Sequence, residues 1–316
     1  MKSEGEVALS AEIDRSDRSN VWSEYYQEFH CFSDETVRPG CHPRKLVHKK
    51  LPGKAIVLVH GLTDSPYYMK AIGDYFHETL GFNVYMPLLQ GHGLAHPDGM
   101  AGVSLDQWKN NVNFAIQVAA KDAEQVSIGG LSTGGALSFY SGCTDPKING
   151  ALYLFSAAFG LYGGRFEVFG RIKEAFLRTP LLRLGNSKKP LAGSNPYRYD
   201  RVPLRSAAEL IRLITEIDVL LKQTANTTAA KRIFSAWSEF DQVVSGRKLK
   251  GLKKLTGEKE FTSFIIPKAA KVEHACVVLD EPIYAIDSEP EDAPLEAANP
   301  YFAEMMAAIL RFESAG

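Results

Sequence analysis

The segment Gly130-Leu131-Ser132-Thr133-Gly134 matches the pattern G-x-S-x-G and joins two elements of different period. The short apolar run at 125–129 predicts a strand before it, and the small residues of 132–143 predict a helix after it. A serine on so sharp a turn has a strained backbone, and its glycine neighbours let the adjacent strand pack closely. The pattern therefore predicts a nucleophile elbow, with the hydroxyl of Ser132 raised above the sheet edge. The alternative is a glycine-rich turn in which Ser132 is an ordinary N-cap.

Strand and helix patterns alternate on both sides of this segment. Apolar runs typical of strands buried on both faces are found at 54–60 and 150–156, and further strand patterns are found at 81–87, 125–129, 231–237 and 261–266. Helical patterns are found at 65–80, 105–121, 132–143, 205–223 and 300–312. Such alternation predicts an α/β fold, with a doubly wound, mostly parallel sheet and helices on both faces.

These patterns divide the chain into three parts. Residues 1–50 show no clear period and are expected to form an N-terminal extension, with one short helix within 22–30. The α/β core is expected at 51–159 and 229–316. The alternation stops in between, where glycine and proline residues separate mostly helical segments. Residues 160–228 are therefore expected to form a helical insertion into the core.

Composition and charge exclude several classes of protein. The 316 residues are 45% hydrophobic with a formal net charge of -1, so no global charge favours a nucleic acid or a membrane surface. No apolar run reaches the roughly 18–20 residues that span a bilayer, and the polar start lacks a secretory signal, so we expect a cytoplasmic protein. The four cysteines form no metal-binding pattern. Free thiols are expected in a reducing cytosol, and pairing of Cys31 with Cys41 stays open.

Three glycine-containing motifs lie in register along the chain. They are His60-Gly61-Leu62 after the first buried run, Gly91-His92-Gly93 after the second, and the segment 130–135. In this order they resemble the α/β-hydrolase superfamily, and more narrowly its carboxylesterase and monoacylglycerol-lipase-like branch, over about residues 52–312. The resemblance implies a serine hydrolase that cleaves carboxylic esters of short to medium acyl chain, monoacylglycerols among them. It also implies a small-molecule ester as the partner, no metal or organic cofactor, and a cap over the nucleophile formed by the insertion.

The catalytic residues of this fold follow the chain order serine, acid, histidine. Ser132 is the candidate nucleophile. His274 is the only histidine after it in the sequence and lies beyond the last predicted strand, so it is the candidate base. The resemblance indicates Asp241 as the acid, because it precedes a small apolar pair in the loop after 231–237, and Glu239 is its competitor.

Two backbone amides form the oxyanion hole of the fold. One belongs to the residue after the nucleophile, Thr133, and the resemblance implies that Leu62 supplies the other. Gly61 lets the backbone turn toward the site. We expect His60 and His92 to orient their loops by hydrogen bonds rather than to transfer protons.

The insertion bears on the substrate. Its apolar side chains at 161–182 are expected either to line an acyl pocket or to pack the insertion onto the core. Basic residues gather at 165–189, where they either attract an anionic substrate or lipid surface, face solvent or face the seven carboxylates at 280–296. The same triad acting on a peptide, thioester or lactone bond is the first alternative function, and a non-catalytic binding protein of this fold is the second. The sequence leaves the oligomeric state open.

Overall fold

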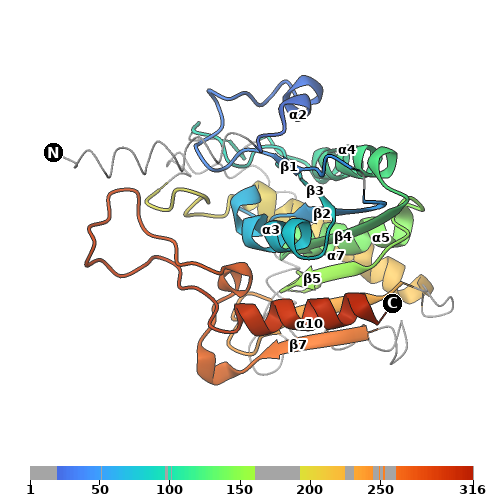
Figure 1. The fold of residues 1–316 in the computed structure, drawn as a ribbon. Helices are drawn as coiled ribbons and strands as arrows, with labels where there is room; N and C mark the ends of the chain where they lie inside the picture. The colour runs from blue at the N-terminus through green and yellow to red at the C-terminus, as the bar shows by residue number, and fades with distance from the viewer. Residues whose placement is uncertain are drawn as a thin grey trace.

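A seven-stranded sheet forms the centre of the molecule (Figure 1). The computed structural model describes residues 20–50, 52–96, 99–100, 102–160, 193–224, 231–244, 249, 252 and 261–315. The strands are β1 (Arg44–Leu46), β2 (Lys54–Val59), β3 (Asn83–Met86), β4 (Gln125–Leu131), β5 (Leu152–Phe155), β6 (Ile233–Ser238) and β7 (Phe261–Ile266). Their order is β1-β3-β2-β4-β5-β6-β7, and every neighbouring pair is parallel except β1 with β3. The predicted doubly wound, mostly parallel sheet is confirmed.

Helices cover both faces of the sheet because its central strands are apolar on both faces. In β2, Ala55, Val57 and Val59 belong to one hydrophobic cluster, and Ile56 and Leu58 belong to the other. The first cluster includes α4 (Leu105–Asp122), α5 (Thr133–Thr144) and α7 (Leu204–Thr224). The second includes η1 (Pro66–Met69), α3 (Lys70–Glu78), η4 (Ala275–Val278) and α10 (Phe302–Ser314), and a further short helix, η3 (Lys268–Ala270), follows β7. Two cores therefore lie on opposite sides of one sheet.

The helix α4 begins at a capping box. The Ser104 hydroxyl accepts a hydrogen bond from the amide of Gln107, and the Gln107 side chain accepts one from the Ser104 amide. Its apolar face buries Trp108, whose indole Nε1–H donates to the carbonyl of Gln90 at 3.1 Å. This contact fixes α4 to the loop that follows β3, which carries one of the three glycine motifs.

The segment before residue 50 contributes to both the sheet and the core. The short helix expected within 22–30 is α2 (Ser23–Glu28), whereas β1 was not predicted. Trp22 and Tyr25 are buried, and the ring of Trp22 lies 5.5 Å from that of Tyr85 and 5.6 Å from that of Phe114. The Tyr25 hydroxyl donates to the carbonyl of Leu88 at 2.7 Å. From residue 20 onward, the expected extension therefore packs closely on the rest of the molecule.

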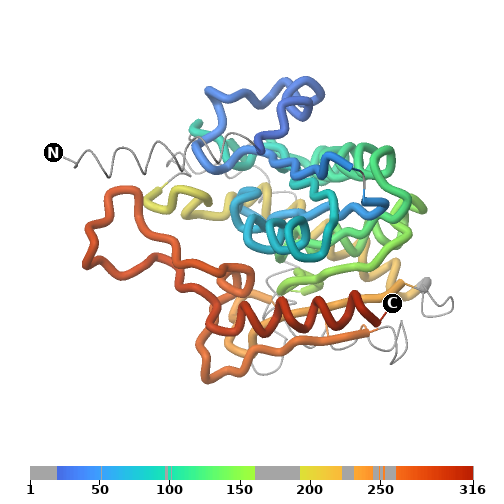
Figure 2. Tube along the Cα trace, in the orientation of Figure 1, coloured from blue at the N-terminus to red at the C-terminus, as the bar shows by residue number. Residues whose placement is uncertain are grey.

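The expected insertion is described only in part. Residues 161–192 and 225–230 lie outside the described residues, so the predicted apolar stretch 161–182 and the basic stretch 165–189 do too. The predicted helix 205–223 is α7, which packs against α4 and α5. The acidic residues of 280–296 belong to a long excursion between η4 and α10 (Figure 2). The excursion contacts the segment before α7, where the amide of Ile286 donates to the carbonyl of Ser194 at 3.0 Å.

Three observations concern membranes, metals and cysteines. Of the helices that the structure describes, none combines the length and apolar character needed to cross a membrane. The described ranges contain no cluster of three or more His, Cys, Asp or Glu side chains suited to a metal ion. None of the four cysteines forms a disulfide, and Cys41 is buried while Cys31 is exposed.

Candidate active site

Ser132 lies between the end of β4 and the start of α5, with φ 54° and ψ −114°. A left-handed backbone at a non-glycine residue costs roughly 1–2 kcal/mol, so the surrounding packing must impose it. Two glycines permit that packing. A Cβ at Gly134 would lie 2.0 Å from the carbonyl oxygen of Val59, and one at Gly130 would lie 2.4 Å from the same oxygen. The Ser132 side chain makes no capping hydrogen bond, which disfavours the ordinary N-cap alternative.

The backbone of Ser132 is held from both sides. Its amide donates to the carbonyl of Phe155 at 2.9 Å, and its carbonyl accepts from the amides of Ala136 and Ala158, each at 3.0 Å. The residue is 7% exposed and lines a cavity. The first amides of α5 also begin here, and unpaired amides at a helix start favour negative charge.

Asp241 and His274 meet although they are 33 residues apart in the sequence. Asp241 follows β6, and His274 follows β7 and the short helix η3. The Nδ1 atom of His274 lies 2.6 Å from Oδ2 of Asp241, while Oδ1 of Asp241 accepts from the amides of Val243 and Val244 at 2.8 and 3.1 Å. The competing carboxylate, Glu239, is exposed, and the carboxylate that contacts His274 is that of Asp241.

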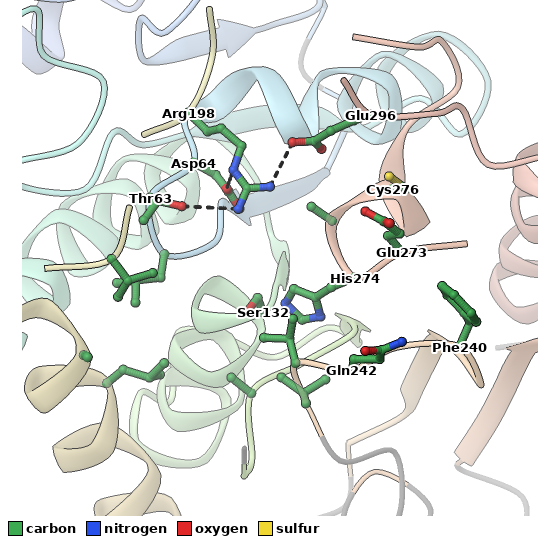
Figure 3. Close-up of a pocket in the computed structure, with 18 of the residues that line it drawn as sticks. Thr63, Asp64, Ser132, Arg198, Phe240, Gln242, Glu273, His274, Cys276 and Glu296 are labelled. Atoms are coloured by element: carbon green, nitrogen blue, oxygen red, sulfur yellow. Dashed lines mark hydrogen bonds and ion pairs between the residues drawn. The ribbon is translucent and has the colours of Figure 1, made fainter. Parts of the chain in front are cut away.

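The environment of Asp241 keeps it ionised. Burial alone would raise its pKa, but the hydrogen bond and charge of His274 and the two loop amides together lower the pKa below its usual value. The other imidazole nitrogen of His274, Nε2, is buried and has no hydrogen-bond partner in the described part of the chain. His274 lies beside Ser132 in Figure 3, and both line the same cavity. The structure thus brings together the three residues predicted for the triad.

Leu62 and Thr133, the predicted oxyanion donors, both lie near the nucleophile. Thr133 is the first residue of α5, and Leu62 lines the cavity next to Ser132. A Cβ at Gly61 would lie 3.3 Å from that of Ser132, so the loop after β2 passes close to the nucleophile. Among the described residues, neither amide makes a backbone hydrogen bond. Two unpaired donors are what a developing oxyanion requires.

His60 and His92 lie behind this loop rather than in the cavity. Nε2 of His60 accepts from the amide of Leu89 at 3.1 Å, which leaves Nδ1–H to donate to the carbonyl of Gly61 at 2.9 Å. Nδ1 of His92 lies 3.2 Å from the carbonyl of Leu89 and 3.1 Å from that of Gln90. Burial lowers the pKa of both rings, to about 4 for His92. Both are therefore neutral at pH 7, and their contacts tie the loop after β2 to the loop after β3.

The cavity has a volume of about 700 Å³ and a mixed lining. Its apolar lining residues include Leu62, Ala158, Val202, Ala207, Leu210 and Val244. Its charged and polar lining residues include Thr63, Asp64, Arg198, Glu273 and Glu296. In Figure 3, Asp64, Arg198 and Glu296 lie on one side of the Ser132 and His274 side chains, and Gln242 lies on the other. A molecule with an apolar part and a polar part would match this mixed lining.

Sequence reasoning missed the group formed by Asp64, Arg198 and Glu296. Nη1 of Arg198 lies 2.9 Å from Oε1 of Glu296, and Nε lies 3.5 Å from Oδ1 of Asp64. Burial raises the pKa of Asp64 to about 6, although Arg198 acts in the opposite direction. Asp64 is the one member with a visible signal, since it directly follows the motif His60-Gly61-Leu62 and Thr63. Arg198 and Glu296 are 98 positions apart, and no sequence pattern joins them.

Comparison with known proteins places the chain in a family. Residues 50–248 match the family described as serine aminopeptidase, S33. The chain belongs to that family. This S33-family chain is 29% identical over 171 residues to a thermostable monoacylglycerol lipase of Bacillus sp. (strain H-257), covering 51% of the chain and 62% of the relative. It is 30% identical over 93 residues to a carboxylesterase of Bacillus subtilis (strain 168), covering 29% of the chain and 37% of the relative. The chain thus spans less than two thirds of the length of these relatives.

Solved structures support the same fold. A metagenome-derived lipolytic enzyme superposes with a TM-score of 0.62 at 18% identity, over 88% of this chain and 99% of the other. A soluble variant of monoglyceride lipase from Saccharomyces cerevisiae superposes with a TM-score of 0.61 at 9% identity, over 90% and 98%. The α/β-hydrolase fold is confirmed, and so is the resemblance to the carboxylesterase and monoacylglycerol-lipase-like branch.

Proposed function

We propose that this S33-family chain is a serine hydrolase that cleaves carboxylic esters. One observation carries the proposal: Ser132 lies on a strained strand-to-helix turn, in a cavity shared with His274, whose ring is held by Asp241 at 2.6 Å. A strained serine backbone is stable only where the surroundings impose it, and such strain gathers at functional sites. The combination of nucleophile, base and orienting carboxylate is that of covalent acyl transfer.

In the first half of the proposed reaction, His274 removes the proton of the Ser132 hydroxyl through Nε2 as the oxygen attacks the ester carbonyl carbon. The unpaired Nε2 is available for this because Nδ1 is engaged by Asp241. The carbonyl oxygen becomes an oxyanion and accepts hydrogen bonds from the amides of Leu62 and Thr133. Loss of one such donor typically costs about 2.7–4 kcal/mol of transition-state stabilisation.

In the second half, the C–O bond to the leaving alcohol breaks and His274 returns the proton to the alcohol oxygen. A covalent acyl-Ser132 intermediate remains. Water, deprotonated by His274, attacks this acyl carbon, and the carboxylic acid is released with Ser132 regenerated. Throughout, Asp241 keeps its negative charge and stabilises the imidazolium that forms twice in the cycle, as its lowered pKa allows.

We extend the proposal to esters of short to medium acyl chain. The apolar residues of the cavity lining, such as Val202 and Leu210, suit an acyl chain. Two relatives are named monoacylglycerol lipase and carboxylesterase, and we extend the cleavage of carboxylic esters to this chain as part of the proposal.

The first experiment measures hydrolysis of p-nitrophenyl esters, with acyl chains from about two to sixteen carbons, by wild type and Ser132→Ala. We expect turnover by wild type and a loss of at least about 10³-fold in kcat for the variant, because no other group supplies the nucleophile. Ser141→Ala, on the same helix as the elbow, is the matched control and should keep wild-type activity. The chain-length optimum reports the size of the acyl side of the cavity.

Two outcomes contradict the proposal. If Ser132→Ala matches wild type, another residue is the nucleophile and the mechanism above is wrong. If wild type is inert on every ester, its turnover is measured on a peptide, a thioester and a lactone. Activity on one of those keeps the triad and changes the bond, whereas inertness on all of them favours a binding protein of this fold.

A further inference from the structure

The loop that carries Leu62 is strained next to the nucleophile. Thr63 has φ 71°, in the left-handed region that a β-branched residue rarely adopts. The carbonyl of Thr63 accepts from the amide of Tyr199 at 2.8 Å, and its hydroxyl lies 3.5 Å from Nη2 of Arg198. Residues from a distant part of the chain therefore hold this turn, and they hold it at the position of a proposed oxyanion donor.

Arg198 is itself fixed before any ligand binds. The Arg198 side chain is 31% exposed, and its guanidinium lies between Asp64 and Glu296, as Figure 3 shows. Oε1 of Glu296 also accepts hydrogen bonds from the Tyr68 hydroxyl at 2.7 Å and from the side-chain amide Nδ2 of Asn195 at 3.1 Å. We refer to Asp64, Arg198 and Glu296 as the Arg198 latch. The latch joins the loop after β2 to the segment before α7 and to the excursion before α10.

The latch also places a negative charge close to the reacting atoms. A Cβ at Gly61 would lie 2.2 Å from Oδ2 of Asp64 and 3.3 Å from the Cβ of Ser132, so the carboxylate and the nucleophile approach Gly61 together. Asp64 is 3% exposed, which limits its screening by water. An uncompensated carboxylate there would oppose the negative charge that develops on the oxyanion. Arg198 offsets that charge.

We propose that Arg198 is a positioning residue, which holds the turn at Leu62–Asp64 in the conformation that presents the Leu62 amide and balances the charge of Asp64. The inference rests on the proposed ester hydrolysis. Arg198 acts on the oxyanion through Thr63 and Asp64, not by direct contact. Its charge is already engaged by two carboxylates, which makes it a poor anchor for an anionic substrate.

The experiment compares Arg198→Gln, Arg198→Lys and the double variant Arg198→Gln with Asp64→Asn, using the p-nitrophenyl ester that wild type cleaves best. We measure kcat and KM for each, and the inhibition constant of a trifluoromethyl ketone, which forms a tetrahedral, anionic adduct on a catalytic serine. Arg212→Gln is the matched control, because Arg212 also pairs with carboxylates but on the outer surface of α7. It should leave all three quantities unchanged.

We expect Arg198→Gln to lower kcat by roughly 10- to 100-fold with KM changed less than about threefold, because a misplaced donor is lost mainly in the transition state. The ketone should bind more weakly by a similar factor. The double variant should recover about tenfold of the lost kcat, because removing the carboxylate removes the unbalanced charge. Arg198→Lys should fall between wild type and Arg198→Gln.

A rise in KM at constant kcat would overturn the inference, since Arg198 would then bind the substrate in its ground state. An unchanged kcat and an unchanged inhibition constant would overturn it too. If circular dichroism shows that Arg198→Gln does not fold, the test uses Arg198→Lys and the single variant Asp64→Asn instead. The inference is overturned if both of these variants bind the ketone as tightly as wild type does. If wild type cleaves no ester and does not react with a fluorophosphonate, the proposed ester hydrolysis is wrong. That result is distinguishable from a failure of the inference about Arg198, which requires an active wild type.

Discussion

Two strand-to-helix turns meet at the candidate site, and they are stabilised in opposite ways. The turn from β4 to α5 places Ser132 at φ 54°, and the turn from β2 to η1 places Thr63 at φ 71°. The first is held by close packing and hydrogen bonds of the neighbouring backbone, and Gly130 and Gly134 leave no room for a side chain against Val59. The second is held by polar contacts from residues about 135 positions away.

The difference shows how a strained backbone can be maintained. Close packing against a neighbouring strand is local and needs only small residues, so the sequence pattern records it. A polar latch depends on residues that only the fold brings together, and its strength depends on protonation and on burial. The nucleophile turn should therefore tolerate changes of pH but should lose its conformation when a larger side chain is added to it. The Leu62–Asp64 turn should be more sensitive to pH than to the size of its side chains.

The largest effect should come from adding one methyl group to the nucleophile turn. Gly134→Ala puts a Cβ 2.0 Å from the carbonyl oxygen of Val59 and 2.4 Å from that of His60, and neither backbone group can move aside cheaply. We expect a loss of at least about 4 kcal/mol in the free energy of unfolding, measured by urea titration, or failure to fold. Gly102→Ala is the control, since nothing lies within 4 Å of its Cβ, and it should have no measurable effect. Equal stabilities of the two variants would contradict a packed elbow.

The next effect concerns pH and the latch. Burial raises the pKa of Asp64 to about 6 in the folded protein, above the value of 3.8 for an isolated side chain. The folded state therefore binds this proton more tightly than the unfolded state, and the stability linked to Asp64 increases as pH falls from 7 toward 4. Relative to Asp64→Asn, wild type should gain up to about 3 kcal/mol of unfolding free energy over that range. Urea titrations of both proteins at pH 7, 5.5 and 4 measure it.

Asp241 supplies the matched comparison of opposite sign. The hydrogen bond and charge of His274 outweigh burial and lower its pKa, so the stability that it contributes is present above its ordinary pKa and is lost on acidification. Relative to Asp241→Asn, wild type should therefore lose stability as pH falls. If both aspartates gave the same sign, the assignment of one as a latch and the other as an ionised partner of His274 would be wrong.

The smallest effect should come from an ion pair that lacks burial. Arg212 and Asp106 join α7 to α4 at 3.0 Å, with side chains 41% and 66% exposed. Exposed pairs typically contribute about 0.2–1 kcal/mol, and salt screens them. Arg212 also pairs with Glu209, whose side chain is only 7% exposed, so the change is made at Asp106 instead. Asp106→Asn should lower the unfolding free energy by less than about 1 kcal/mol, and by less still in 0.5 M salt. A loss larger than that of Arg198→Gln would contradict the importance that we give to burial.

The predicted strands and helices agree with the structure because the spacing of apolar residues within each segment reflects which of its faces are buried. The run at 54–60 is continuous in apolar residues because β2 is covered on both faces, and 205–223 has helical spacing because α7 packs on one side. Ser132 and its glycines were recognisable for the same reason. Most of the expected cap lies outside the described residues, so that prediction stays a prediction.

What the sequence did not reveal depends on distant contacts. The strand β1 has three residues, Arg44–Leu46, with no period long enough to recognise, and it exists because β3 offers an edge. Arg198 looked like any surface arginine in a loop. Only the fold shows that Asp64 and Glu296 contact it. The strength of the ion pairs among these three residues depends on their burial, which the residue types alone do not reveal.

The strand β1 also shows that the start of the family match and the start of the folded unit are different positions in the chain. The family match begins at residue 50, after β1, whereas the folded unit includes residues from at least 20. A chain that began at residue 50 would lack β1, so β3 would be an open edge of the sheet. It would also expose the rings of Tyr85 and Phe114, which Trp22 contacts. An exposed edge beside apolar surface is a site for pairing with another copy, so such a trimmed chain should aggregate. The residues least recognisable as part of the family therefore cover an edge and an apolar surface that would otherwise be open to pairing.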